Sequence, residues 1–196
     1  MAETEAERRD AHPLLVLMCG RSFSGKSTLA RAITDELGGD IVSLDAINEE
    51  RGLRGGEGIP INEWARTNDE ADARAALALA AGRPVVVDDT SSPRFLRDGW
   101  RRLAERSSSR FVLVYVNAAE SLILERVEAN RQAGDRHDAR DELLQAHLGS
   151  FEPPASDEPH ILVDGGGYDV AKVVAAVSRD TSSRVPGPQV VSRDLK

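Results

Sequence analysis

The stretch Leu14–Ser27 reads LLVLMCGRSFSGKS, an apolar run that leads directly into the pattern G-x-x-x-x-G-K-S. The apolar run predicts a buried strand, and the following residues, 28–37, favour a helix. Between a strand and a helix, this pattern is a phosphate-binding loop: its glycines let backbone N–H groups converge on a phosphate, and the helix N-terminus adds positive potential. The sequence therefore predicts that the chain binds a nucleoside triphosphate.

Two residues of the loop carry specific chemistry. Lys26 is expected to reach the β- and γ-phosphates, and the Ser27 hydroxyl is placed to ligate Mg²⁺. Only three of the 25 basic residues are lysines, so a lysine kept at this position fits a role that a compact ammonium fills better than a planar guanidinium. We therefore expect Lys26 to be catalytic and Ser27 to be a metal ligand.

Composition bounds the class of protein. The chain has 196 residues, of which 40% are hydrophobic and 30% are charged. This length and composition predict one globular domain with a full hydrophobic core. Its single cysteine, Cys19, excludes an internal disulfide and fits a reducing compartment. The start of the chain does not resemble a signal peptide, and no run is long enough to span a membrane, so we expect a cytoplasmic protein. A net charge of -8 argues against an extended nucleic-acid partner and leaves the oligomeric state open.

Short apolar runs alternate with longer amphipathic stretches, which is typical of a parallel α/β architecture. The predicted strands are 14–19, 41–44, 84–87, 111–116 and 160–163. The predicted helices are 26–37, 68–81, 93–107, 119–131, 140–151 and 168–178. Residues 1–12 are expected to be a flexible segment, 13–178 the nucleotide-binding domain, and 179–196 a disordered C-terminal tail.

Carboxylates follow two of the predicted strands, where ligands of parallel sheets bind. Asp45 ends the run from Ile41, and we expect it to take the proton of an acceptor hydroxyl as a catalytic base; a helix cap is the alternative. Asp88 follows three valines and is the predicted second metal ligand. Asp89 either contacts the substrate or caps the next helix, and Thr90 offers its hydroxyl to the acceptor.

Arginines gather near the end of the fourth predicted helix, at positions 126, 131, 136 and 140. Gly134 lies within this series and suggests that a short mobile lid covers about 131–140. Guanidinium groups on such a lid match the charge that develops on a transferred phosphoryl group, so Arg131 is a predicted catalytic residue. The expected ATP contacts are Arg21, Ser22, Phe23, Ser24, Gly25, Lys26, Ser27, Thr28, Arg126 and Arg131.

The identity of a phosphate acceptor is expected to depend on residues 51–60, RGLRGGEGIP. Arg51 and Arg54 are predicted to grip an anionic or hydroxyl-rich acceptor, although a flexible surface loop would have the same composition.

The order of these motifs resembles that of the small P-loop kinases of the zeta-toxin, polynucleotide-kinase and chloramphenicol-phosphotransferase group, which are often labelled AAA-like ATPase domains. The motifs are, in chain order, the phosphate loop, Asp45, Asp88-Asp89-Thr90, Arg126 with Arg131, and 151–154 (FEPP). The resemblance covers residues 13–177. It implies a P-loop NTPase of the nucleoside-kinase-like, three-layer type with a five-stranded parallel sheet in the order 2-3-1-4-5. It also implies Mg·ATP as donor. Residues 45–53 resemble the matching stretch of adenylylsulfate kinases.

Three functions remain open at this stage. The first is a kinase that phosphorylates a hydroxyl of a small molecule such as an antibiotic, a sugar or a nucleoside. The second is a kinase of nucleic-acid 5′-hydroxyl ends or of nucleotide-sugars. The third is a nucleotide-dependent regulatory binder without an acceptor. A guanine-reading Asn-Lys-x-Asp is missing after the fourth strand, where residues 117–120 read NAAE, so ATP is the expected nucleotide.

Overall fold

The computed structural model describes residues 13–53, 58–133, 141–179 and 189–191. Its centre is a six-stranded parallel sheet in the order β2-β3-β1-β4-β5-β6. The strands are β1 (Leu14–Cys19), β2 (Asp40–Ser43), β3 (Val85–Asp88), β4 (Arg110–Asn117), β5 (Ile161–Asp164) and β6 (Gln189–Val191). Every residue of β1 is buried, as expected for a central strand of a parallel sheet that is covered on both faces.

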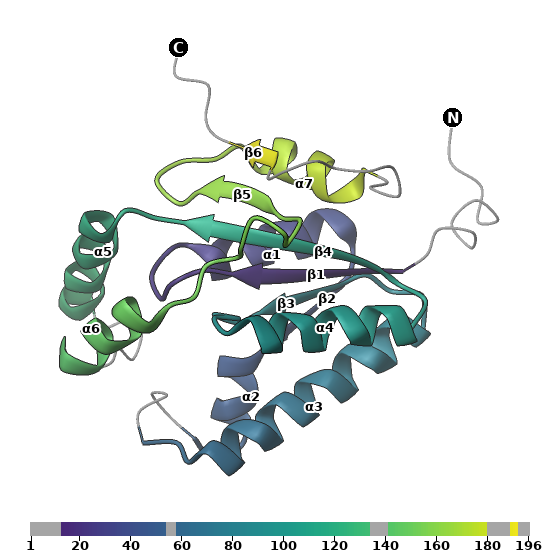
Figure 1. The fold of residues 1–196 in the computed structure, drawn as a ribbon, viewed down its shortest axis with the longest axis horizontal. Helices are drawn as coiled ribbons and strands as arrows, with labels where there is room; N and C mark the ends of the chain where they lie inside the picture. Colours follow the sequence, from purple (N-terminus) through teal and green to yellow (C-terminus); the bar gives the residue numbers. More distant parts are fainter. Residues whose placement is uncertain (1–12, 54–57, 134–140, 180–188, 192–196) are drawn as a thin grey trace.

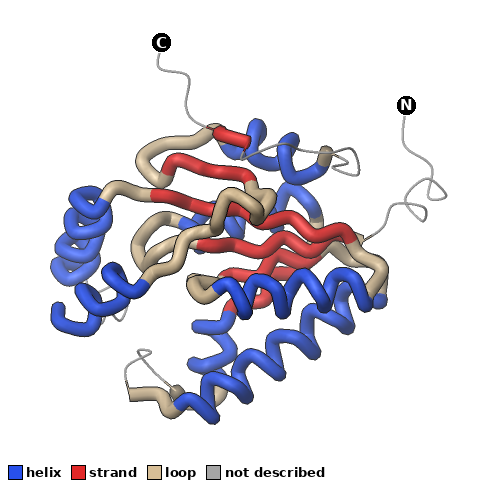
Figure 2. The backbone as a smooth tube through the Cα atoms, in the orientation of Figure 1, coloured by secondary structure: helices blue, strands red, loops and turns tan. Residues whose placement is uncertain are grey.

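Helices cover the two faces of the sheet. In chain order they are α1 (Lys26–Leu37), α2 (Leu44–Glu50), α3 (Ile61–Ala80), α4 (Arg94–Arg106), α5 (Glu120–Ala133), α6 (Asp141–Ser150) and α7 (Val170–Ser178). Helices α3 and α4 lie on one face, and α1 and α7 lie on the other (Figure 1). Figure 2 shows the sheet between these two layers. The fold is therefore a three-layer α/β sandwich.

Alternate residues of β1 divide the core between the two faces. Leu15, Leu17 and Cys19 pack with α3 and α4, whereas Val16 and Met18 pack with α1 and α7. A smaller apolar cluster joins α5 and α6 and includes Ala118, Ile123, Val127, Leu144 and Leu148, with Phe23 of the loop packed against it. Both of these helices lie beyond the carboxyl ends of the strands (Figure 1). The phosphate loop is thus enclosed by the sheet edge and by α5.

Three sequence-based predictions need correction. The sheet has six strands rather than five, because β6 pairs in parallel with β5; the predicted order 2-3-1-4-5 holds for the other five. This strand falls inside the stretch 179–196 that was expected to be disordered. Asp45 does not end a strand: Ser43 caps α2 by accepting a hydrogen bond from the Ala46 N–H at 3.3 Å, and Asp45 lies in the first turn of that helix. Helix α3 begins at Ile61 rather than at residue 68.

Candidate active site

The phosphate loop has its shape because of two glycines. Gly20 has φ 154°, and a Cβ there would lie 2.6 Å from the carbonyl oxygen of Val116 on β4. Gly25 has φ 98° and immediately precedes α1. Any other residue would be strained at either position, and at Gly20 it would also collide with the backbone. The loop therefore turns tightly between β1 and α1 and leaves the amino end of α1 open.

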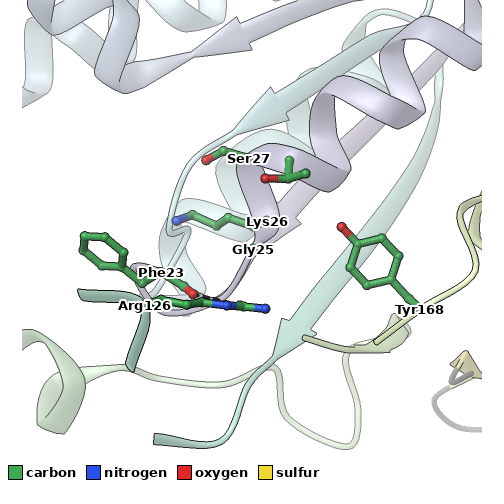
Figure 3. Close-up of a pocket in the computed structure, with 7 residues that line it drawn as sticks. Phe23, Gly25, Lys26, Ser27, Arg126 and Tyr168 are labelled. Atoms are coloured by element: carbon green, nitrogen blue, oxygen red, sulfur yellow. Dashed lines mark hydrogen bonds between the residues drawn. The ribbon is translucent and has the colours of Figure 1, made fainter. Parts of the chain in front are cut away.

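A cavity of about 290 Å³ lies at this helix terminus. Its lining residues are Phe23, Gly25, Lys26, Ser27, Thr28, Arg126 and Tyr168. Figure 3 shows Lys26 and Ser27 at the start of α1, Arg126 alongside the loop, and Tyr168 on the other side of the cavity. Six of the ten residues predicted to contact ATP line this cavity. The sequence offered no signal for Tyr168, which follows the glycines of residues 165–167.

Ser27 and Asp88 are brought together, as the sequence predicts for two ligands of one metal ion. The Ser27 hydroxyl donates a hydrogen bond to Oδ1 of Asp88 at 3.2 Å, and Lys26 beside it is buried, with 5% of its surface exposed. One carboxylate and one hydroxyl fit Mg²⁺, which takes few protein ligands and fills its shell with phosphate oxygens and water. Among the described residues, no three His, Cys, Asp or Glu side chains form a cluster that could hold a metal ion.

Arg126 connects α5 to both loops that border the cavity. Its guanidinium donates to the carbonyl of Phe23 at 3.0 Å and to the carbonyl of Gly165 at 2.7 Å. Gly165 itself packs tightly on the loop, because an added Cβ would lie 2.7 Å from the carbonyl oxygen of Ser24. Arg126 and Gly165 thus hold the phosphate loop against the loop that follows β5.

The predicted acceptor residues are distributed differently. Asp45 is exposed and lies two residues after Ser43, whose register partner in β3 is Asp88, so it belongs to the same carboxyl edge. Arg51 is engaged elsewhere: it pairs with Glu63 at 2.5 Å and donates to the Thr67 hydroxyl at 2.5 Å. These contacts tie the end of α2 to α3, so Arg51 has an evident structural role in addition to any contact with an acceptor.

The loop after β3 is held by its own side chains. Oδ2 of Asp89 accepts from the N–H of Ser91 at 2.8 Å and from its hydroxyl at 3.1 Å. Burial raises the pKa of Asp89, while these hydrogen bonds and the charge of Lys26 act in the opposite direction. The carbonyl of Thr90 accepts from the N–H of Gly20 at 3.2 Å, which fixes this loop next to the phosphate loop. Asp89 therefore stabilises the turn after β3, and it does not cap the next helix as one alternative predicted, because the N-cap residue of α4 is Pro93 and no side chain caps it.

A buried ion pair that the sequence analysis missed supports the same loop. Arg97 of α4 is fully buried and meets Glu158 in a two-point contact, at 2.8 Å and 2.7 Å. The remaining amino group of Arg97 donates to the carbonyls of Ser91 and Glu152 at 3.0 Å each and to that of Ser92. Arg97 thus joins the loop after β3 to residues 151–158.

Three further predicted ATP contacts do not line the cavity. Arg131 is exposed in the last turn of α5, and Ser22 and Ser24 belong to the phosphate loop without lining the cavity. Arg54 and most of the proposed lid at 131–140 lie outside the described residues. Burial raises the pKa of the Cys19 thiol to about 12, which agrees with a core residue rather than a nucleophile. Among the described helices, none has the length and hydropathy that crossing a membrane requires.

A parallel three-layer sandwich with this loop, the Ser27–Asp88 pair and Lys26 is the arrangement of a P-loop NTPase, the class that includes the P-loop kinases. The sequence comparison agrees: residues 15–154 match the family described as AAA domain, and the chain belongs to that family. This confirms the resemblance inferred from the motifs.

Individual relatives are also kinases. The chain is 28% identical to a rat protein named probable gluconokinase, over 83% of this chain and 96% of that protein. A gluconokinase from Sinorhizobium meliloti is 27% identical, with a TM-score of 0.61 over 85% of this chain and 90% of that structure. The APS kinase of Mycobacterium tuberculosis has the same fold, with a TM-score of 0.61 at 16% identity over 85% of this chain and 96% of that structure.

Proposed function

We propose that this protein transfers the γ-phosphate of ATP to a hydroxyl group of a small, polyol-type molecule. The observation that carries the proposal is the Ser27–Asp88 hydrogen bond at 3.2 Å, beside the buried Lys26 and at the sheet edge that also holds Asp45. Phosphoryl transfer needs a metal site, a phosphate-binding cation and a carboxylate at one place, and the residues that we propose for these three roles lie along this edge.

The donor side is formed by the loop and the start of α1. Backbone N–H groups of the loop and Nζ of Lys26 would hold the β- and γ-phosphates, and Arg126 would border the nucleotide from α5. Ser27 and Asp88 would hold Mg²⁺, directly or through its water shell. When bound, this ion neutralises phosphate charge and orients the phosphate chain. Arg131, on the last turn of α5, would place its guanidinium against the transferred phosphoryl group and stabilise its negative charge.

The acceptor side begins at Asp45. In the proposed reaction the acceptor oxygen forms a bond to the γ-phosphorus while the bond from that phosphorus to the β–γ bridging oxygen breaks. ADP leaves, and the proton of the acceptor hydroxyl passes to the carboxylate of Asp45. Asp45 is exposed at the sheet edge, where an acceptor can reach it. Thr90, on the neighbouring loop, would donate a hydrogen bond to the phosphate acceptor or receive one from it.

The names of the relatives support a polyol rather than an antibiotic, a nucleoside or a nucleic-acid end. Both the rat protein and the S. meliloti protein are called gluconokinases, and the rat protein spans almost the same length as this chain. We further propose that the enzyme works in the cytoplasm, where a reduced, buried Cys19 is the expected state.

The proposal is tested by following phosphate transfer from labelled ATP to a panel of polyols, sugars, nucleosides, aminoglycosides and 5′-hydroxyl oligonucleotides. We expect transfer to a polyol or sugar, and its loss in Lys26→Met. Lys172→Met is the matched control, because Lys172 is exposed on α7 and does not line the cavity. Transfer to oligonucleotides alone, or ATP hydrolysis that no acceptor stimulates, would contradict the proposal.

A further inference from the structure

Arg21, the second residue of the phosphate loop, is a cation for which the described part of the chain provides no carboxylate partner. It is half-buried, and its guanidinium lies 5.9 Å from the ring centre of Phe151. Two arginines of α4 are neutralised instead: Arg97 pairs with Glu158 at 2.7 Å and Arg94 with Asp157 at 2.9 Å. Stacking on an aromatic ring orients a guanidinium without occupying its N–H groups.

The position of Arg21 separates it from the nucleotide cavity. Phe151 stacks on Tyr115 with ring centres 5.9 Å apart, and both rings pack against the core on the α3–α4 side of the sheet. Tyr168, which lines the nucleotide cavity, packs against the core on the α1–α7 side. Although Arg21 belongs to the loop, it does not line that cavity. Its guanidinium therefore lies with Phe151 on the α3–α4 side of the sheet, whereas Tyr168 of the cavity lies on the α1–α7 side.

The loops around Arg21 are the ones that border the acceptor side. Gly20, its neighbour, donates to the carbonyl of Thr90 at 3.2 Å. The N–H of Glu152, next to Phe151, donates to the Ser92 hydroxyl at 2.9 Å, so the loop after β3 and the loop after α6 meet here. Burial raises the pKa of Tyr115 on β4, and the charge of Arg21 acts against this shift without reversing it. Arg21 thus lies where the phosphate loop, the loop after β3 and residues 151–152 meet.

We propose that Arg21 binds an anionic group of the acceptor and so makes the enzyme selective for acidic polyols, such as sugar acids, over their neutral counterparts. The inference rests on the proposed function, because it assigns one end of the same acceptor. Guanidinium and carboxylate form a paired, two-point hydrogen bond that a neutral hydroxyl cannot replace. This role differs from the nucleotide contact that the motif alone predicts for the residue.

Sheet geometry indicates the size of the acceptor. Arg21 follows β1 and Asp45 follows β2, and both strands pair with β3. Two strand spacings separate these strand ends by about 10 Å. An acceptor that contacts both residues must therefore bridge the separation between the ends of β1 and β2, with its anionic group at one end and its reactive hydroxyl at the other.

The test uses two pairs of compounds that differ in a carboxylate: D-gluconate with D-sorbitol, and D-glucuronate with D-glucose. Binding is measured by calorimetry on the full chain with Mg²⁺ and a non-hydrolysable ATP analogue, and transfer is measured separately with ATP. We expect an acid to be preferred over its neutral partner, and Arg21→Gln to reduce that preference at least tenfold without changing the affinity for the ATP analogue. Arg94→Gln removes the same charge from an exposed ion pair and is the matched control.

Each outcome bears on one claim. Acid binding that depends on Arg21 without phosphate transfer would support the inference and contradict the proposed function. Transfer to neutral acceptors at rates that Arg21→Gln leaves unchanged would overturn the inference and keep the function. Equal affinity for acid and neutral compounds, or no binding of either acid, would also overturn the inference. So would a loss of nucleotide affinity in Arg21→Gln that equals its loss of acid affinity.

Discussion

The hydroxyl of Ser27 donates a hydrogen bond to Oδ1 of Asp88 at 3.2 Å, although the two residues are 61 positions apart in the chain. The contact joins the first turn of α1 to the end of β3. It exists because β1 and β3 are parallel neighbours, with Leu17 beside Val87, so the chain leaves both strands at the same edge. Two oxygen ligands suited to Mg²⁺ thus meet without any local sequence relationship.

The first prediction concerns this pair. Asp88→Asn removes the negative charge but keeps the size of the side chain, so we expect the Mg²⁺ concentration needed for half-maximal transfer to rise about 10- to 100-fold. Titrating the transfer rate with Mg²⁺ measures this shift. Asp40→Asn is the control, because Asp40 lies at the amino end of β2 and pairs with Arg83. An unchanged Mg²⁺ requirement in Asp88→Asn would remove Asp88 from the metal site.

The second prediction concerns the proposed base. Asp45→Asn should keep its affinity for ATP and lose about 10²- to 10⁴-fold in the rate of transfer, the usual contribution of a positioned general base. Single-turnover measurements with bound ATP separate the chemical step from nucleotide binding. Glu49→Gln, one turn later on α2 and exposed, controls for the loss of an acidic side chain nearby. Transfer at the wild-type rate in Asp45→Asn would show that another group accepts the proton.

Much of the fold was predictable from the sequence because the strands are nearly continuous apolar runs. All five predicted strands are present, with ends within one residue of those observed. Such runs are typical of parallel strands buried on both faces. The phosphate loop was equally predictable from the sequence. Its glycines and Lys26 are consecutive in the chain, so the motif can be identified without knowing which distant residues it contacts.

The missed elements are short. Helix α2 has seven residues, too few to show a helical period, and its Leu44 continues the apolar run of β2. Strand β6 has three residues inside a polar tail, and its pairing with β5 depends on a distant neighbour. Local propensity does not predict pairing of this kind.

Arg97 could have been found from its spacing. It lies three residues before Trp100 and seven before Ala104, and this helical spacing places all three on the buried face of α4. Arg101 and Arg102 are not among the buried residues of the helix. An arginine within an apolar helical face requires a buried partner. The identity of that partner, Glu158, could not be inferred, because it lies 61 residues away in an irregular segment.

The third prediction tests the packing of the loop after β5. Gly165→Ala places a Cβ 2.7 Å from the carbonyl oxygen of Ser24 and 2.8 Å from Cβ of Ala118, so the phosphate loop must move. We expect a loss of about 1–3 kcal/mol in stability, the usual cost of overpacking, together with weaker ATP binding. Thermal unfolding and calorimetry measure both. Gly149→Ala is the control, because a Cβ there meets nothing within 4 Å. Equal behaviour of the two variants would mean that the loop adapts freely.

The fourth prediction concerns pH and the buried ion pair. The guanidinium of Arg97 lowers the pKa of Glu158 to about 2, from 4.5. A lowered pKa in the folded state means that the pair stabilises the fold fully above pH 4.5, and that this contribution is lost as the pH falls from 4.5 towards 2. The shift corresponds to about 3 kcal/mol in the free energy of unfolding.

Glu158→Gln should therefore lower the free energy of unfolding at pH 7 by about 3–5 kcal/mol, because Arg97 remains buried without its counter-charge. Its stability should also fall less than that of the wild type between pH 4.5 and 2.5. Urea unfolding at several pH values measures both effects, and Glu105→Gln, on the exposed face of α4, is the control. If Glu158→Gln showed the same acid sensitivity as the wild type, another carboxylate would be responsible for it. Arg97→Met combined with Glu158→Leu should recover only part of the loss, because the carbonyls of Ser91 and Glu152 then lack their donor.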